Sequence, residues 1–189
     1  MVRSGFAVLA AGLLLAAAGC GGGSTVFLHP EYNFQVLERV AVIPFDNLSK
    51  DQGAGARATR VFVTELLAAE AFDVVEPGEV TRALEEYATV RTAELTQEQI
   101  VGLGKALRVQ GMVLGTVTES TTLRSGGSAA STVTMVARMV ETETGATVWS
   151  ATQTSGGRGF WASLFGTGDK SHAEVMQACA RSLLNTLVK

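Results

Sequence analysis

The sequence predicts one α/β or α+β sandwich domain, with a mixed sheet of about five strands and helices packed on it. Short apolar runs of strand length alternate with longer segments whose apolar residues recur at helical spacing. A hairpin pattern in the second half of the chain adds antiparallel strands. About 150 residues follow residue 37, which is enough for one domain with its own core.

The first half of the domain contains two expected strands and two expected helices. Val40–Ile43 is a continuous apolar run closed by Pro44, as in a strand that is buried on both faces. Residues 54–69 predict a helix after a polar loop, and residues 72–76 predict a short second strand. Pro77 and Gly78 mark a turn before a short helix, whose apolar face is Val80, Ala83, Leu84 and Tyr87.

The second half begins with a helix and continues with three strands. Thr96 and Gln99 form a capping box ahead of an apolar stripe of Ile100, Leu103, Leu107 and Val109. We expect strands at 111–118, 132–141 and 146–154, with a polar Gly/Ser tip at 124–131 and a turn at 141–145. Ser171 caps a final helix.

Cys179 lies on the apolar face of this final helix. Its neighbours at helical spacing are Val175, Met176, Leu183 and Leu184. We therefore expect a buried core residue rather than a reactive thiol.

The N-terminal segment resembles a lipoprotein signal peptide. Arg3 is its only charge, and the apolar run Phe6–Gly19 is 14 residues long, shorter than the ~20 that a membrane-spanning helix needs. Ala17-Ala18-Gly19-Cys20 resembles a lipobox. This predicts cleavage of residues 1–19, a covalent lipid on Cys20 and a flexible tether over residues 20–37. An N-terminal anchor helix or a buried core helix is the alternative.

The net charge limits the classes of partner, and the cysteine content limits the disulfides that the chain can form. Loss of Arg3 with the leader changes the formal net charge from −3 to −4, so the domain is mildly acidic. This balance argues against nucleic-acid binding and against a polybasic membrane patch. The two cysteines are Cys20 and Cys179, so acylation of Cys20 leaves no intrachain disulfide.

Titratable residues that could form a catalytic or metal site are sparse and scattered. His29 lies in the lead-in and His172 in the first turn of the last helix, and neither has metal-ligand spacing. The carboxylates of loops and polar helix faces are expected to be solvated; they are Asp46, Asp51, Glu85 and Glu86. Glycine-rich stretches lack phosphate-binding fingerprints. We predict a protein that is not an enzyme and has no cofactor or metal besides the lipid. A fold that brings His172 against two carboxylates in a cleft would favour a hydrolase instead.

One segment is rich in large apolar residues between glycines. It carries Phe160, Trp161, Leu164 and Phe165. These side chains either cover an edge of the core or form an exposed patch for a partner or a membrane interface.

Several of these motifs together resemble the CsgG-like lipoprotein superfamily, which includes curli-secretion channel subunits and LpoB-type activators of penicillin-binding proteins. The resemblance is carried by Arg39–Asn47, Phe72–Glu76, Gly111–Val117 and Arg138–Trp149, and it covers roughly residues 38–189 and the lipobox. It implies a lipid-anchored periplasmic α/β domain without enzymatic activity. Gly21, rather than Asp, follows Cys20, which by the enterobacterial retention rule favours the outer membrane, with the domain on the periplasmic face.

The sequence departs from two specialised members of this superfamily. Membrane hairpins of a channel need strands of about 9–11 alternating residues, whereas 124–131 and 156–170 are short and do not alternate. Activators of the LpoB type have a long disordered segment between the lipid and the domain, whereas here 17 residues separate Cys20 from Glu38. We therefore predict an accessory or assembly factor that binds a protein partner in the envelope. The alternative is a homo-oligomeric ring subunit of an outer-membrane export system.

Overall fold

The computed structural model describes residues 24–86, 94–125, 128–156 and 170–188. The helices are α2 (Ala54–Ala68), α3 (Pro77–Glu85), α4 (Gln97–Leu107) and α6 (His172–Leu187), with a short 3-10 helix η2 (Phe34–Val36). The strands are β1 (Thr25–Leu28), β2 (Arg39–Val42), β3 (Asp46–Asn47), β4 (Asp73–Val74), β5 (Gly111–Ser125), β6 (Ser128–Glu141) and β7 (Thr147–Gly156).

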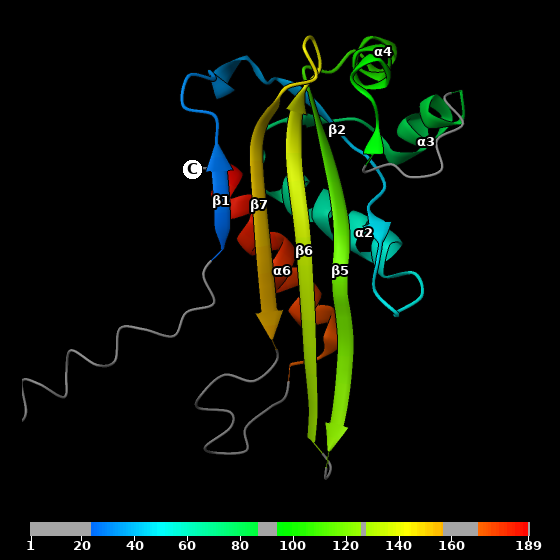
Figure 1. The fold of residues 1–189 in the computed structure, drawn as a ribbon, viewed down its shortest axis with the longest axis vertical. Coiled ribbons are helices and arrows are strands. Elements are labelled where there is room, and N and C mark those ends of the chain that lie inside the picture. The colour runs from blue at the N-terminus through cyan, green and yellow to red at the C-terminus, as the bar shows by residue number, and fades with distance from the viewer. Residues whose placement is uncertain (1–23, 87–93, 126–127, 157–169, 189) are drawn as a thin grey trace, which may run out of the picture.

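The strands form one mixed seven-stranded sheet in the order β1-β7-β6-β5-β2-β4 (Figure 1). Strand β3 pairs with β5 next to β2, at Thr116 and Val117. The first four strands of this order are antiparallel, whereas β2 runs parallel to β5 and to β4. The sheet and its helices make a single α/β domain, which confirms the predicted fold class. Strands β1 and β3 raise the number of strands above the five that the sequence predicts.

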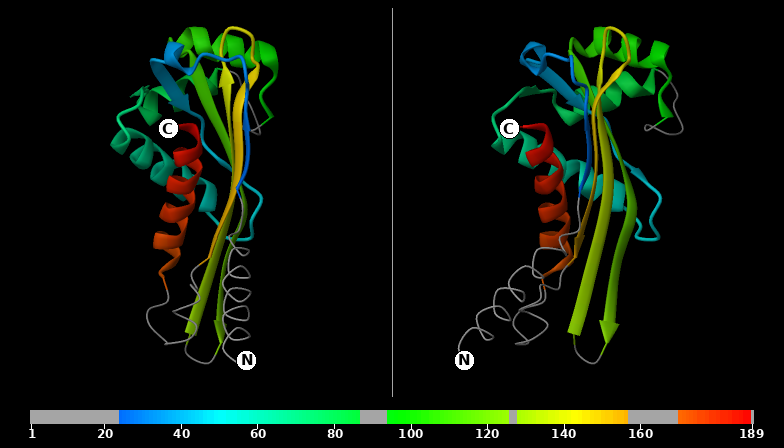
Figure 2. Two further views of the ribbon diagram at one scale, coloured as in Figure 1. Left: turned by 90° about the vertical axis from the view of Figure 1, so that its left-hand side faces the viewer. Right: turned by 60° about the vertical axis from the view of Figure 1, so that its left-hand side comes forward.

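Helices cover the two faces of the sheet unequally. Helices α2 and α6 pack side by side along one face, whereas α3 and α4 cover the other face only at one end (Figure 2). In β2, Val40 and Val42 point to the α2/α6 layer, and Ala41 points to the α3/α4 layer. Burial on both faces explains the continuous apolar run at this strand.

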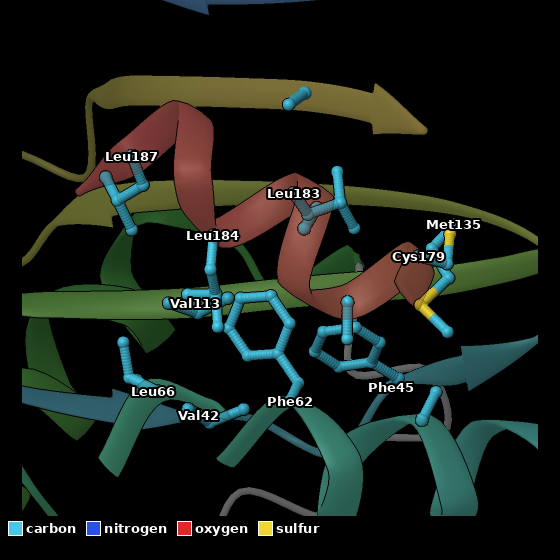
Figure 3. Close-up of a cluster of buried hydrophobic side chains, with 14 of the residues drawn as sticks. Val42, Phe45, Phe62, Leu66, Val113, Met135, Cys179, Leu183, Leu184 and Leu187 are labelled. Atoms are coloured by element: carbon cyan, nitrogen blue, oxygen red, sulfur yellow. The ribbon is translucent and has the colours of Figure 1, made fainter. Parts of the chain in front are cut away.

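The larger core lies between the sheet and the α2/α6 layer (Figure 3). Phe62 of α2 packs against Phe45, with ring centroids 5.3 Å apart. Leu183 of α6 is fully buried in the same cluster. At the rim of this layer, Glu65 of α2 accepts hydrogen bonds from Gln177 and Arg181 of α6 at 2.7 and 2.9 Å, so the two helices are joined by polar contacts as well.

Helices α4 and α6 each begin with a side-chain capping box. Thr96 and Gln99 form the predicted capping box of α4, and Ser171 forms a second box with Glu174 at the start of α6. In each box the hydroxyl accepts from the third helical N–H, while the longer side chain accepts from the backbone N–H of the capping residue. These boxes satisfy donors that a helix start otherwise leaves unpaired.

The sheet begins within the range that the sequence assigns to the tether. Residues 25–28 pair with β7 as the edge strand β1, with Thr25 opposite Thr152. The described sheet therefore includes four residues, Thr25–Leu28, that precede Glu38. The run Thr-Val-Phe-Leu consists mostly of residue types that are favoured in strands, which explains why it adds to an available sheet edge.

The β5–β6 hairpin is longer than predicted. The strands continue to Ser125 and Ser128, so most of the expected tip at 124–131 is paired strand. Threonines of high strand propensity replace apolar residues in this part, which hides it from an apolar pattern. Beyond the levels of Gly156 in β7 and Asn47 in β3, the described hairpin consists of these two strands alone (Figure 1).

Gly115 of β5 is expected to be essential for the packing of the larger core. A Cβ at this position would lie 2.4 Å from the Phe45 ring. We expect Gly115→Ala to lower the free energy of unfolding by about 1–3 kcal/mol, measured by urea denaturation. Gly78→Ala is the matched control, because a Cβ at Gly78 would meet nothing within 4 Å. Equal effects of the two changes would contradict this account.

Candidate functional site

Two of the predicted sites lie outside the described residues. They are the lipidation site Cys20 and the apolar segment with Phe160, Trp161, Leu164 and Phe165. Both stay predictions. The described flanks of the second segment are Gly156 at the end of β7 and Lys170 just before α6.

Asp51, Ser120 and His172 come together in a polar cluster, which we call the root cluster because it lies where the β5–β6 hairpin leaves the rest of the sheet. The Ser120 hydroxyl donates to Asp51 Oδ2 at 2.6 Å and lies 3.0 Å from His172 Nε2. Arg57 of α2 forms an ion pair with the same Asp51 oxygen. The cluster joins the loop after β3, strand β5, helix α2 and the first residue of α6.

A β-bulge makes this cluster possible. The register of β5 against β6 shifts between Val117 and Glu119. The shift places Ser120 opposite Val133, and therefore on the face that α2 and α6 cover. Ser120 is 3% exposed, and its hydroxyl has two polar partners, Asp51 and His172.

The root cluster does not have the geometry of a Ser-His-Asp triad. A triad needs the carboxylate on one imidazole nitrogen and the serine on the other. Here Asp51 and Ser120 both approach Nε2 of His172, and Nδ1 lies 3.4 Å from the Thr122 hydroxyl. Among the described residues, the carboxylate in contact with His172 is that of Asp51, which already binds Arg57 and Ser120. The arrangement suits a structural junction better than an activated nucleophile.

The electrostatics of Asp51 follow from these contacts. The hydrogen bond from Arg57, and then that from Ser120, hold the pKa of the Asp51 carboxyl below its ordinary value, because both stabilise the charged form. The ionised carboxylate therefore contributes to stability above the ordinary pKa of an aspartate. That contribution is lost as the pH falls through the lowered pKa of the folded state.

The other titratable candidates do not join the root cluster. The N–H of His29 pairs with β7 beyond β1, Asp46 lies in β3, and Glu85 and Glu86 are exposed at the end of α3. Within the described ranges, His, Cys, Asp and Glu form no group of three that could hold a metal ion. No helix in the described part of the chain is both long and apolar enough to cross a membrane.

Cys179 is buried in the larger core, as expected. Its thiol donates to the Gln153 carbonyl at 3.3 Å, and burial raises its pKa to about 11. The thiolate, which is the reactive form, is therefore scarce at neutral pH.

Strand β1 forms an exposed apolar edge of the sheet. Val26, Phe27 and Leu28 are 40%, 46% and 42% exposed. The N–H of His29 donates to Val148 on the β7 side, so by the alternation of an antiparallel ladder the N–H groups of Val26 and Leu28 point to the open edge. An unpaired strand edge is a template for another strand.

A concavity of about 920 Å³ adjoins β1 at the end of the sheet that carries the β6–β7 turn. Its walls come from the segment after β1, the end of α4 and this turn; they include His29, Tyr32, Lys105, Arg108 and Glu143. Within the described residues, the enclosed Tyr32 hydroxyl has no hydrogen-bond partner. Burial, and then Glu141 and Glu143, raise the pKa of Tyr32, so the hydroxyl keeps its proton and can donate to an incoming group.

Sequence reasoning missed both the root cluster and the β1 edge. Asp51 and His172 are 69 and 52 positions from Ser120, and the bulge that turns Ser120 inward has no sequence signal in a Thr/Ser run. The β1 edge did have a signal, because the strand-favouring residues Thr25, Val26 and Phe27 directly follow a Gly/Ser run.

Comparison with known proteins gives a family match and a common fold. The family model described as "Peptidoglycan-synthase activator LpoB" matches residues 32–154. No curated protein sequence matches the chain. A PelC dodecamer from Paraburkholderia phytofirmans is similar with a TM-score of 0.61 and 20% identity, over 88% of this chain and 96% of that one. Lipoprotein GNA1162 from Neisseria meningitidis is similar with a TM-score of 0.58 and 17% identity, over 79% and 97%.

Removal of the Asp51 charge tests the root cluster. We expect Asp51→Asn to lower the free energy of unfolding at pH 7 by about 1–3 kcal/mol, because hydrogen bonds to the charged carboxylate are lost. The difference from the unchanged protein should shrink as the pH falls through the lowered pKa of Asp51. Urea denaturation at several pH values measures this, with the exposed Glu86→Gln as control. A difference that is independent of pH would contradict the assignment.

Proposed function

Because the chain belongs to the peptidoglycan-synthase activator LpoB family, we propose that it is a non-enzymatic lipoprotein of the cell envelope that works by binding another protein. The matched region begins four residues after β1 and runs through most of β7. It therefore contains strands β2 to β6, helices α2, α3 and α4, and the loop of Asp51. The family description speaks of activation of a synthase, and the same mode of action, through protein contact rather than chemistry, is what we propose for this chain.

The observation that carries this proposal is the open edge at β1. Its outward N–H groups at Val26 and Leu28 and its half-exposed apolar side chains offer main-chain hydrogen bonds and apolar contact together. Strand addition to such an edge is a common mode of protein recognition. The adjoining concavity, with the free Tyr32 hydroxyl, extends the same surface.

The proposed anchor places this edge next to a membrane. Five residue steps separate Cys20 from Thr25, which is at most about 17 Å of extended chain. A domain on so short a tether meets partners that lie at its own membrane. We therefore favour an accessory or assembly factor at the periplasmic face of the outer membrane over an activator that reaches across the envelope.

A homo-oligomeric ring is the second candidate, and the fold similarity to a PelC dodecamer favours it. In this version the partner at β1 is another copy of the same chain. The contact must then join two different surfaces, because repeated contact between unlike surfaces closes a ring of many subunits. The predicted contact segment with Phe160, Trp161, Leu164 and Phe165 is a candidate for part of that interface.

The anchor itself is tested by Cys20→Ser. We expect the unchanged protein to fractionate with membranes and to carry the mass of a diacylglycerol and an acyl chain on its N-terminal Cys20. The variant should lack the lipid mass. Intact-protein mass spectrometry of the two purified forms measures this, and an unchanged protein without the mass of the lipid on Cys20 would contradict lipidation.

The β1 edge is tested by a photo-crosslinking amino acid in place of Val26. We expect crosslinks to a protein partner, because the outward edge is covered in the assembly. The same amino acid in place of Leu67, which is 53% exposed on α2, is the control. A further Leu28→Pro change removes an outward N–H without removing a β1–β7 hydrogen bond, and it should abolish the crosslink. Equal crosslinking from both positions would contradict the edge.

The solution mass separates the two candidates. Light scattering of the acylated, detergent-extracted protein, with the detergent subtracted, should give a monomer or small oligomer for the accessory factor. A mass of many subunits, lowered by Leu28→Pro, would establish the ring instead.

A further inference from the structure

The sheet register shows how far the β5–β6 hairpin extends past the start of the domain. Thr25 pairs with Thr152, and Thr152 pairs with Val136 of β6. From Val136, strand β6 continues for eight residues to Ser128, next to the hairpin turn. At ~3.3 Å per residue, this end of the hairpin lies about 26 Å beyond the level of Thr25.

The chain enters the sheet from the side of this hairpin end. Strand β1 is antiparallel to β7, and β7 runs toward Gly156, so the N-terminal end of β1 at Thr25 faces the Gly156 end of the sheet (Figure 1). Cys20 lies at most about 17 Å from Thr25 along an extended chain. In an upright domain, the lipid-bearing residue therefore stops about 9 Å short of the level that the hairpin reaches.

We propose that the hairpin end, residues 121–125 and 128–131, is a second membrane contact, which the short tether holds in the lipid headgroup layer. This inference rests on the proposed lipid at Cys20. The headgroup region of one leaflet is about 5–8 Å thick, which is close to the 9 Å by which the hairpin exceeds the tether. The anchor and the hairpin end then meet the same bilayer surface at two points and fix the orientation of the domain.

The chemistry of the hairpin end fits a headgroup layer. Leu123 is 73% exposed, and Thr121 and Thr122 are exposed beside it. From Ser120 to Thr132 the sequence has no Asp or Glu, and its one charged residue is Arg124. One cation without carboxylates suits an anionic lipid surface. The segment has too few apolar residues to span the hydrocarbon, so contact stays at the surface.

The hairpin cannot easily fold away from the membrane, because its base is held. Ser120 of β5 is bound to Asp51 and to His172, and those residues belong to the loop before α2 and to α6. Thr122 and Ser131 add a cross-strand contact at 3.1 Å just beyond this point. The root cluster therefore gives the hairpin a fixed direction.

A fluorescent label at the hairpin end tests the proposal. The acylated full-length Leu123→Cys protein is labelled with an environment-sensitive dye, because Cys20 is acylated and Cys179 is buried with a raised pKa. It is reconstituted in phosphatidylethanolamine/phosphatidylglycerol vesicles that carry nitroxide lipids. We expect headgroup nitroxides to quench this label severalfold more than the same label at Ala146→Cys, an exposed position in the β6–β7 turn at the opposite end of the sheet.

Two further measurements distinguish the role of the short tether from that of the lipid anchor. A Gly/Ser insertion of about a dozen residues between Gly23 and Ser24 should reduce the quenching at position 123; unchanged quenching would overturn the role of the tether. Flotation of the vesicles reports the anchor independently. Protein that does not float refutes the proposed lipidation, whereas floating protein with equal quenching at both positions refutes the hairpin contact. A blue shift without lipid quenching would show that another copy covers Leu123, which also overturns the proposal.

Discussion

Strand β5 is hydrogen-bonded on both of its edges along its first half, to β2 and then β3 on one side and to β6 on the other. Both faces of that half are buried, with Val113 toward the α2/α6 layer and Met112 toward the α3/α4 layer. No other strand contacts both the parallel and the antiparallel part of the described sheet. The positions of β2, β7 and the two helix layers therefore depend on the straight course and register of β5. The close contact between Gly115 of β5 and the Phe45 ring is one example of this constraint.

The parts of the fold that could be predicted from the sequence are those with a strong local pattern. The apolar run at Val40–Ile43, the capping box at Thr96 and the cap at Ser171 all identify elements that the structure contains. Strand β1 and the outer half of the β5–β6 hairpin were not predicted as paired strand. The partner of β1 is distant in sequence, so its short run of strand-favouring residues does not by itself predict pairing. The outer half of the hairpin is polar, so it carries no apolar pattern. The root cluster could not be predicted for a similar reason: its members meet only after a one-residue bulge turns Ser120 inward.

The candidate surfaces of this protein lie at its edges and ends rather than in a catalytic cleft. The titratable residues that meet, Asp51 and His172, are bound to their neighbours in a way that strengthens a junction. Exposed apolar residues gather instead on the edge strand, as Val26, Phe27 and Leu28, and Leu123 lies exposed near the hairpin turn. This distribution agrees with membership of a family described by activation of another protein. Residues 32–154, the part that the family model matches, do not include the edge strand that we propose as the contact.

The position of β1 has a consequence for the order of events during biogenesis. Thr25 and Thr152 are 127 positions apart, so this pairing closes a very long loop and forms late in folding. In a chain that is cleaved and acylated at Cys20, the processing enzymes need the residues around the cysteine in an accessible, extended form. Late pairing of β1 keeps them accessible while the rest of the sheet is already made. If Cys20 is acylated as we propose, we expect maturation of the anchor and completion of the sheet edge to be successive steps.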